Sequence, residues 1–395
     1  MMMNDCAMIY VHIPFCIRKC AYCDFLSFSA PHSVKEAYRK ALLAEISARK
    51  EEAGGKYISS VFFGGGTPTA LPPAWLAEFL DALRKNYIFA DDAEITTEAN
   101  PGTLCAEGLR LLKNAGFNRI SIGVQSLNDR ELKDLGRIHT AEEAETAYHL
   151  AREAGFTNIN LDLMSGIPGQ TKTSWEDTLH RVCRMGPEHI SAYSLIIEEG
   201  TLFFENQESL ELPDEDTERE MYESTRKILA EYGFTQYEIS NYAKAGFACR
   251  HNIGYWTGVP YIGMGLHASS YDGRARWTNA GEMRVYLDHY AGGQFEASEG
   301  TDFNRPAPGS ALRCEEEILT EEDLMAEFMI LGLRMNRGIS EAEFAARFGC
   351  SICSQYGDRI RKYTGLGLLT EMAGRLFLTE KGRSLSNIVM ADFLP

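Results

Sequence analysis

The stretch Tyr10-Val-His-Ile-Pro-Phe-Cys-Ile-Arg-Lys-Cys-Ala-Tyr-Cys-Asp-Phe25 places three cysteines directly behind a short apolar strand. Cys16, Cys20 and Cys23 are spaced C-x3-C-x2-C, so three thiolates on one tight loop can converge on a single inorganic centre. A cubane iron–sulfur cluster held by three cysteines leaves one iron open for an outside ligand. The stretch therefore predicts a metal-containing centre at the end of the first strand, and an iron–sulfur cluster is favoured.

The alternative is a structural zinc site, which requires a fourth protein ligand. Cys6 or His12 could supply that ligand. Cys350 and Cys353 form a separate C-x-x-C pair that we interpret as inert, because no second pair follows it. Six scattered cysteines are interpreted as small buried apolar residues: Cys6, Cys105, Cys183, Cys249, Cys314 and Cys350.

Composition limits the classes of protein that the chain can be. Its 395 residues predict one domain of roughly 250–300 residues and a smaller second one. The formal charge of −17 argues against a nucleic-acid partner, because phosphate binding requires clustered Lys and Arg. The apolar stretches are too short to span a membrane, and the first residues do not resemble a signal peptide. We therefore expect the protein in the cytoplasm.

Apolar runs and amphipathic stretches alternate along the first half of the chain. Six runs rich in Ile, Val and Phe predict strands at 9–12, 57–63, 94–98, 119–124, 158–164 and 189–196. Five amphipathic stretches between them predict helices at 34–52, 73–85, 104–115, 141–154 and 173–185. This alternation favours an α/β fold in which a parallel sheet forms a partial (β/α)6, TIM-like barrel, open on one side. Sites in such folds lie at the carboxyl ends of the strands.

Three segments are predicted along the chain. Residues 1–235 form the partial barrel with the cysteine loop, and residues 236–310 extend it. A linker rich in Gly, Pro, Ser and Asn is expected from about Gly292 to Ser310. Residues 311–395 predict three helices followed by a hairpin around Gly374, which is typical of a small winged-helix-like domain.

Polar residues recur where the predicted strands end. Gly64-Gly-Gly-Thr-Pro-Thr69 follows the second strand, and its glycines permit close approach of a ligand to the backbone. Glu98 and Gln125 end the next two strands, and Asp162 lies within the fifth. Buried carboxylates require a ligand or a basic partner, and Arg137 is a candidate for that partner. Together these residues predict a pocket for a charged, hydroxylated small molecule.

The cysteine motif, the Gly64–Thr69 run and Asp162 resemble those of the radical S-adenosylmethionine (SAM) enzymes. Within that superfamily the chain is similar to the oxygen-independent coproporphyrinogen III oxidase branch. The resemblance implies that Cys16, Cys20 and Cys23 hold a 4Fe–4S cluster whose open iron binds SAM. It also implies a set of residues that contact this cofactor: Tyr10, Tyr22, Gly65, Gly66, Thr67, Glu98, Gln125, Arg137 and Asp162.

Two departures separate the chain from the oxidases of that branch and make it resemble the HemW-type haem chaperones. The oxidases carry a further cysteine where this chain has Phe25, and a longer extension before the cysteine motif. Arg250-His-Asn-Ile-Gly-Tyr-Trp256 and Tyr261-Ile-Gly-Met-Gly-Leu-His267 also resemble HemW sequences. The helical module beginning Glu327-Phe-Met-Ile-Leu-Gly-Leu-Arg334 looks like the C-terminal domain of that family.

The HemW resemblance implies haem binding and transfer of haem to an acceptor protein, which the sequence does not name. His251 is a candidate haem contact, because neutral imidazole binds haem iron. It could equally order its loop through hydrogen bonds. His267 is a weaker candidate. Two alternatives stay open: a radical enzyme acting on a tetrapyrrole, and a zinc-stabilised interaction protein. For the first of these, oxidation of coproporphyrinogen is doubtful, because Phe25 stands where the oxidases carry a cysteine.

Overall fold

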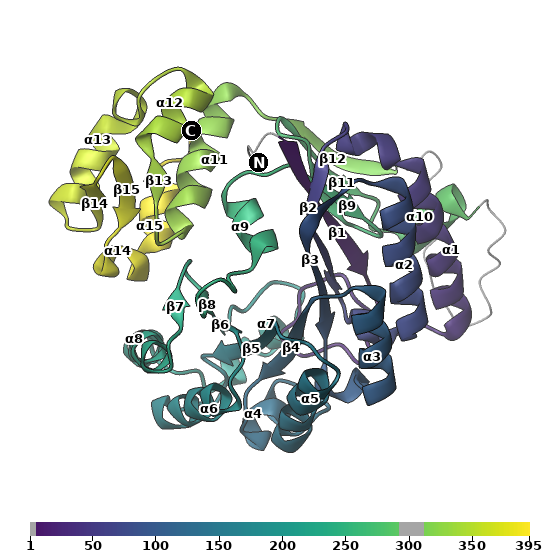
Figure 1. Cartoon of the computed structure of the whole chain (residues 1–395). Coiled ribbons are helices and arrows are strands. Elements are labelled where there is room, and N and C mark those ends of the chain that lie inside the picture. Colours follow the sequence, from purple (N-terminus) through teal and green to yellow (C-terminus); the bar gives the residue numbers. More distant parts are fainter. Residues whose placement is uncertain (1–4, 292–311) are drawn as a thin grey trace.

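Six parallel strands in chain order form the centre of the computed structural model, which describes residues 5–291 and 312–395 (Figure 1). They are β1 (Cys6–Ile13), β2 (Tyr57–Gly65), β3 (Phe89–Ala99), β4 (Arg119–Gln125), β5 (Ile159–Ser165) and β6 (His189–Ser194). Strands such as β4 are buried along nearly their whole length, as expected where helices cover a parallel sheet. The predicted alternation of strands and helices is confirmed.

The sheet is twice as wide as the sequence pattern predicts. Its order is β12-β11-β10-β9-β1-β2-β3-β4-β5-β6-β8-β7. The added strands are β7 (Thr235–Gln236), β8 (Asn241–Ala243), β9 (Tyr261–Met264), β10 (Ser269–Tyr271), β11 (Ala275–Asn279) and β12 (Arg313–Ile318). β9 runs parallel to β1, whereas the other added strands pair antiparallel with their neighbours. Since β1 and β6 are not neighbours, the barrel is not closed.

Helices pack on the sheet between the strands. Those of the first 291 residues are α1 (His32–Ala48), α2 (Pro73–Asn86), α3 (Ala106–Ala115), α4 (Asp129–Asp134), α5 (Ala141–Glu153), α6 (Lys172–Met185), α7 (Leu202–Glu205), α8 (Glu215–Glu231), α9 (Arg250–Trp256) and α10 (Met283–Tyr290). Short 3-10 turns are η2 (Lys50–Ala53), η3 (Pro68–Ala70), η4 (Pro101–Thr103) and η5 (Gln207–Ser209). Thr140 and Thr171 cap α5 and α6, and Gly116 and Gly186 end α3 and α6 in the left-handed conformation.

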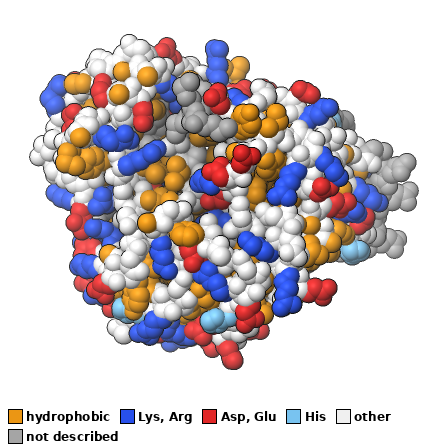
Figure 2. Space-filling view, in the orientation of Figure 1, with side chains coloured by type: hydrophobic (Ala, Val, Ile, Leu, Met, Phe, Trp, Pro, Cys, Tyr) orange, Lys and Arg blue, Asp and Glu red, His pale blue; other side chains and the backbone are white. Residues whose placement is uncertain are grey.

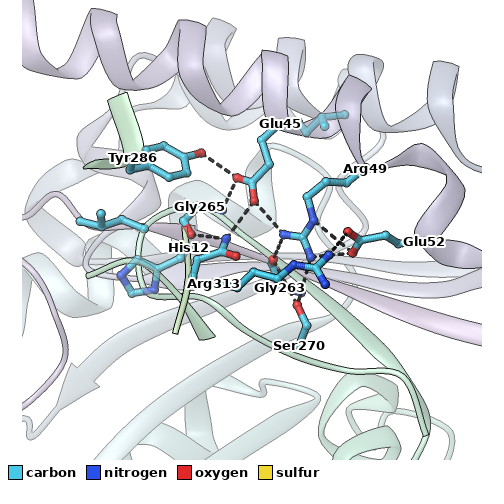
Figure 3. A network of polar contacts seen from close by, with 12 residues as sticks. His12, Glu45, Arg49, Glu52, Gly263, Gly265, Ser270, Tyr286 and Arg313 are labelled. Carbon is cyan, nitrogen blue, oxygen red and sulfur yellow. Dashed lines mark hydrogen bonds and ion pairs between the residues drawn. The ribbon is translucent and has the colours of Figure 1, made fainter. Parts of the chain in front are cut away.

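A buried polar network attaches α1 to the added strands (Figure 3). The fully buried Glu45 carboxylate accepts hydrogen bonds from the Gly265 amide at 2.7 Å, the Tyr286 hydroxyl at 2.7 Å and the Arg49 guanidinium at 2.7 Å. Arg49 also donates to the Gly263 carbonyl at 2.6 Å. Both partners of this ion pair are buried. The network therefore fixes Gly263, in β9, and Gly265, which follows β9, against α1.

The C-terminal module has its own hydrophobic core, which includes Leu333, Phe344 and Phe393. Its elements are α11 (Glu321–Arg334), β13 (Ile339–Ser340), α12 (Glu341–Phe348), α13 (Ile352–Gly365), β14 (Leu369–Met372), β15 (Arg375–Leu378), α14 (Glu380–Ser384) and α15 (Ser386–Ala391). The three helices and the hairpin follow the predicted winged-helix-like order, and β13 and two short helices complete it.

The module packs against the β7–β8 edge of the sheet (Figure 1). The Asn336 amide donates to the Tyr237 carbonyl at 2.9 Å, and its side chain donates to the Gln236 carbonyl at 2.7 Å. The predicted linker from Gly292 to Ser310 lies outside the described residues. Within residues 5–291 and 312–395, no helix combines the length and the apolar character needed to cross a membrane.

Candidate functional site

The three-cysteine loop leaves the carboxyl end of β1 and is held against its surroundings by main-chain hydrogen bonds. The Cys16 amide donates to the Phe28 carbonyl at 3.0 Å, and the Ala21 amide donates to the Leu135 carbonyl at 3.1 Å. A turn joins the Cys23 amide to the Cys20 carbonyl at 3.3 Å. Cys16, Cys20 and Cys23 are all free thiols. The loop thus presents three possible metal ligands from a fixed backbone.

Polar groups surround these thiols. The Thr67 hydroxyl lies 3.5 Å from the Cys16 sulfur, and the Arg137 guanidinium donates to the Cys20 sulfur at 3.5 Å. Burial raises the pKa of the Cys23 thiol, and the negative charge of nearby Cys20 raises it further. Three neighbouring thiols, of which Cys16 is buried and the other two are partly exposed, repel one another as thiolates and suit a bound cationic centre, which binds the thiolate form. The donor set therefore fits a cluster with three cysteine ligands.

Neither candidate for a fourth zinc ligand is in place. Cys6 pairs with Tyr57 at the start of β1, at the opposite end of this strand from the cysteine loop. His12 uses both ring nitrogens, with Nδ1 3.1 Å from the Tyr10 hydroxyl and Nε2 3.0 Å from the Leu26 carbonyl. In the described part of the chain, no three His, Cys, Asp or Glu side chains converge on one point as a single metal ion requires.

The Gly64–Thr69 run begins with the last two residues of β2, which pair with the end of β1, and continues beyond the strand. Gly65 has φ +106°, and a Cβ there would lie 2.4 Å from the His12 ring. A Cβ on Gly66 would lie 2.9 Å from the Ile13 carbonyl oxygen. The Gly66 and Thr67 amides donate to the carbonyls of Ile13 and Phe15, both at 2.8 Å. These glycines therefore permit close packing of the chain segments, and the amides of Gly66 and Thr67 are already bonded to the main chain rather than open to a ligand.

Two carboxylates line a cavity of about 230 Å³ inside the barrel. The Glu98 carboxylate accepts a hydrogen bond from the Gly65 amide at 3.2 Å. Burial and the nearby Asp162 raise the pKa of Glu98 to about 8. Burial also raises the pKa of Asp162, although Ser121 and Asn160 donate to it at 2.9 and 2.7 Å. At neutral pH, Glu98 therefore holds a proton that a cationic ligand would displace.

The basic partner expected for these carboxylates is not Arg137. Arg137 donates to the Asn100 side chain at 2.6 Å and to the Gly123 carbonyl at 2.5 Å, beside the Cys20 thiol. The charge that opposes the raised pKa of Glu98 and Asp162 comes from Arg119, which is 2% exposed at the start of β4. In the sequence, Arg119 stands out as a single charge in a strand whose other residues are mainly apolar, and this pattern could have indicated a buried charged partner.

Gln125 ends β4 in a strained conformation. Its φ of +66° is unusual for a residue with a side chain, and the ladder with β5 shifts its register there. Such strain persists where surrounding structure imposes it, commonly at functional sites.

Of the two predicted tyrosines, Tyr10 lies in β1 and Tyr22 lies within the cysteine loop, between Cys20 and Cys23. The Tyr10 hydroxyl approaches His12, and burial raises its pKa, with Glu98 adding to the effect. Burial also raises the pKa of Tyr22, which the nearby Arg137 partly opposes. Both phenols therefore remain neutral hydrogen-bonding groups at physiological pH.

His251 lies at the start of α9 and is 1% exposed. Its Nδ1 lies 2.8 Å from the Ser60 hydroxyl, and its Nε2 lies 3.2 Å from the Tyr255 hydroxyl. The ring stacks on Phe62 with centroids 5.2 Å apart, and burial lowers the pKa of His251 to about 3. A neutral histidine with both nitrogens bonded agrees with the second of the two predicted roles, the ordering of its own segment, and the haem contact stays a prediction. His267 has φ +56° in a turn where its amide donates to the Ala280 carbonyl at 3.1 Å.

Of the predicted cofactor residues, Tyr10, Gly65, Glu98 and Asp162 line the barrel cavity, whereas Thr67 and Arg137 lie beside the cysteine thiols. Asn252 and Tyr255 of the Arg250–Trp256 motif also line the cavity, and the lining residues that the sequence did not indicate are Phe62, Arg119, Ser121, Asn160, Ser191 and Tyr193. Several of these residues lie in the middle of strands. The sequence shows that their side chains are polar, but it does not show whether they point into the cavity or toward the helices.

Comparison with known proteins agrees with this geometry. Residues 10–182 match the Radical SAM superfamily model, and residues 319–385 match the HemN C-terminal domain model. The crystal structure of coproporphyrinogen III oxidase (HemN) from Escherichia coli superimposes with a TM-score of 0.81 at 25% identity, covering 98% of this chain and 90% of that one. The barrel and its three-cysteine loop thus define a radical SAM protein.

The sequence relatives narrow this class to a family. The heme chaperone HemW of Bacillus subtilis is 37% identical over 388 residues, covering 98% of each chain. The heme chaperone HemW of Escherichia coli is 34% identical and covers 98% of this chain and 97% of that one. The Danio rerio radical S-adenosyl methionine domain-containing protein 1 is 34% identical over 85% of this chain and 74% of its own length. The chain therefore belongs to the HemW family.

Proposed function

We propose that this protein is a haem chaperone, which binds haem and transfers it to an acceptor protein. The observation that carries the proposal is the full-length similarity to relatives named heme chaperones, with 98% coverage of both chains for the Bacillus subtilis protein. Similarity over the whole length includes the C-terminal module and the α9 segment as well as the barrel. The identity of the acceptor and the cytoplasmic location expected from the sequence remain predictions.

In this proposal Cys16, Cys20 and Cys23 hold a 4Fe–4S cluster, and the rim of the barrel binds SAM. The support is that three free thiols share one loop, beside the Thr67 hydroxyl and the Arg137 guanidinium. The cofactor contacts would be Tyr10, Tyr22, Gly65, Gly66, Thr67, Glu98, Gln125, Arg137 and Asp162. Once bound, the cluster and SAM together supply one-electron chemistry that no side chain offers.

The residues themselves supply binding and charge. Glu98 and Asp162 present carboxylates to a cationic sulfonium or ammonium group, and Arg119 keeps this acidic cavity from carrying an unopposed negative charge. Arg137 holds Asn100 and the Gly123 carbonyl beside the Cys20 thiol, so it can position the cluster loop against β4.

A second candidate is a radical enzyme acting on a tetrapyrrole. It is favoured by the TM-score of 0.81 with coproporphyrinogen III oxidase. It is disfavoured by Phe25, which is 62% exposed beside the barrel cavity where the resemblance implies a cysteine in the oxidases.

An anaerobic haem titration of cluster-reconstituted protein tests the proposal. We expect a Soret change that saturates at one haem per chain, followed by loss of that signal when an apo-haemoprotein is added as acceptor. Coproporphyrinogen III incubated with SAM and reductant should remain unchanged. Absence of saturable haem binding would contradict the chaperone, and oxidation of coproporphyrinogen would establish the second candidate.

A further inference from the structure

Helix α9 separates two cavities of different size. His251, Asn252 and Tyr255 line the barrel cavity of about 230 Å³. Trp256, the next residue, lines a cleft of about 810 Å³ on the other side of the helix, between the barrel and the C-terminal module. Pockets for organic ligands commonly measure about 300–1,000 Å³. The barrel cavity is below that range, whereas the cleft is within it.

Apolar and aromatic side chains form the walls of this cleft. It is bounded by the end of α9, the β10–β11 turn, α11 and α12, and Figure 2 shows hydrophobic side chains interspersed with Lys and Arg on this face of the molecule. The apolar lining consists mainly of Trp256, Leu324, Phe328, Leu331, Met335 and Ile339. The Trp256 ring packs 4.3 Å from the Arg334 guanidinium, and its indole N–H is buried without a hydrogen-bond partner. A wide, partly aromatic cleft suits a flat, apolar ligand.

The charges of the cleft are not balanced. Glu327 is paired with Arg276, and Glu343 lies 3.7 Å from Arg375, so both carboxylates already have basic partners. Lys56, Arg337 and Arg347 also line the cleft.

None of these three basic side chains forms an ion pair with a carboxylate in the described part of the chain. Asp272 also lines the cleft, and its carboxylate accepts from the Arg274 and Ala275 amides at 2.8 and 2.7 Å, which hold it in its own turn but leave its charge in place. Three unpaired cations against this single unpaired carboxylate still leave a positive excess around the cleft, which favours an anionic ligand in a chain with a net charge of −17.

We propose that this cleft is the haem site: the porphyrin lies against Trp256 and Phe328, and its two propionates meet Arg337 and Arg347. The proposal rests on the proposed haem-chaperone function. Haem has two properties that match the cleft: an apolar plane, and two carboxylates that accept charge-assisted hydrogen bonds from arginine. Tyr271 and Met335 also line the cleft and are of residue types that ligate haem iron.

The same geometry gives His251 a positioning role. Its bonds to Ser60 and Tyr255 anchor α9 to β2, and α9 in turn presents Trp256 to the cleft.

Filling the cleft tests its role. Ala346 is exposed on the cleft wall, so Ala346→Trp should fill space that the porphyrin needs. Ala342→Trp is the matched control, because Ala342 is exposed on the same helix but does not line the cleft. Haem titration should show at least about tenfold weaker binding for Ala346→Trp and unchanged binding for Ala342→Trp.

Reversing the charge tests the propionate contacts independently. The double variant Arg337→Glu/Arg347→Glu should weaken haem binding about 100-fold, since each arginine loses a charge-assisted contact worth about tenfold. Arg110→Glu reverses an exposed charge on α3, away from the cleft, and should bind haem as the unaltered protein does. Far-ultraviolet circular dichroism and iron content would establish that each variant is folded and loaded.

The outcomes separate the two proposals. If the unaltered protein binds no haem, the chaperone function fails. If it binds haem and both cleft variants bind it equally well, the chaperone function stands and the cleft assignment is overturned. If the cleft instead takes an acidic peptide, haem affinity should be unaffected in both variants, which again overturns the assignment.

Discussion

Glu98 makes a quantitative prediction about the pH dependence of SAM binding. Burial and Asp162 raise the pKa of Glu98 to about 8, so the carboxyl group is largely protonated at pH 7. The sulfonium and ammonium groups of SAM favour the carboxylate. Binding should therefore release a proton, and affinity should increase as the pH approaches 8.

The size of the effect follows from the ionised fraction of Glu98. With a pKa of about 8, roughly 1% of this group is ionised at pH 6 and half at pH 8. If only the carboxylate binds SAM well, affinity should be about 50-fold higher at pH 8, which corresponds to about 2.3 kcal/mol. Calorimetry of cluster-loaded protein at pH 7 in buffers of different ionisation enthalpy should show about 0.9 protons released per SAM bound.

Glu98→Gln supplies the matched control, because glutamine has nearly the same shape and does not ionise in this range. Its affinity for SAM should be low and independent of pH between 6 and 8. An unaltered protein with flat affinity over this range, or a Glu98→Gln variant that keeps the slope, would refute the assignment of Glu98 to SAM binding.

The same ionisation predicts a stability effect that needs no cofactor. The folded-state pKa of Glu98 exceeds the value of 4.5 of an unperturbed group, so this group favours the folded state at low pH, and that contribution is lost as the pH rises from 4.5 to 8. Glu98→Gln should therefore increase the free energy of unfolding at pH 8, by on the order of 4 kcal/mol, and much less at pH 5. Denaturant titrations at the two pH values measure this difference in unfolding free energy. A Glu98→Gln variant that is less stable than the unaltered protein at pH 8 would contradict the prediction.

The remaining predictions concern the buried network, the cluster and the glycine turn. Glu45→Leu should cost about 3–5 kcal/mol of unfolding free energy, because the buried Gly265 amide and Tyr286 hydroxyl lose their acceptor and Arg49 loses one of its two carboxylate partners. Glu36→Ala on the same helix removes a partly exposed ion pair and should cost at most about 1 kcal/mol. Equal midpoints in urea would refute this. Cys20→Ala should abolish the broad brown absorbance of the reconstituted cluster without unfolding the protein, and a retained cluster would show that its thiol is not a ligand. Gly65→Ala should lower SAM affinity at least about tenfold, because its φ of +106° and the neighbouring imidazole both exclude a Cβ, and unaltered affinity by equilibrium dialysis would contradict this role of the turn.

Local sequence patterns determined the parallel core of this protein. The six central strands and their helices follow from apolar periodicity, and caps such as Thr140 and Gly116 mark helix ends within one or two residues. The cysteine spacing likewise indicated which loop carries the three candidate cluster ligands, because all three lie within eight residues. These features depend on neighbours in the chain, which a sequence shows directly.

Tertiary structure decided what lies far apart in sequence and close in space. Strands β9–β12 extend the sheet beside β1, where β9 pairs with β1 and the fully buried Glu45 on α1 binds the Gly265 amide, a contact across 220 residues that no local pattern indicates. Arg119 rather than Arg137 lies near the buried carboxylates. The sequence shows both arginines, but which of them comes close to Glu98 and Asp162 depends on how strands and loops pack in three dimensions. The cleft behind Trp256 exists only where the C-terminal module packs against the barrel. The chain thus encodes its elements locally, whereas the charge and shape of its sites arise from contacts between distant segments.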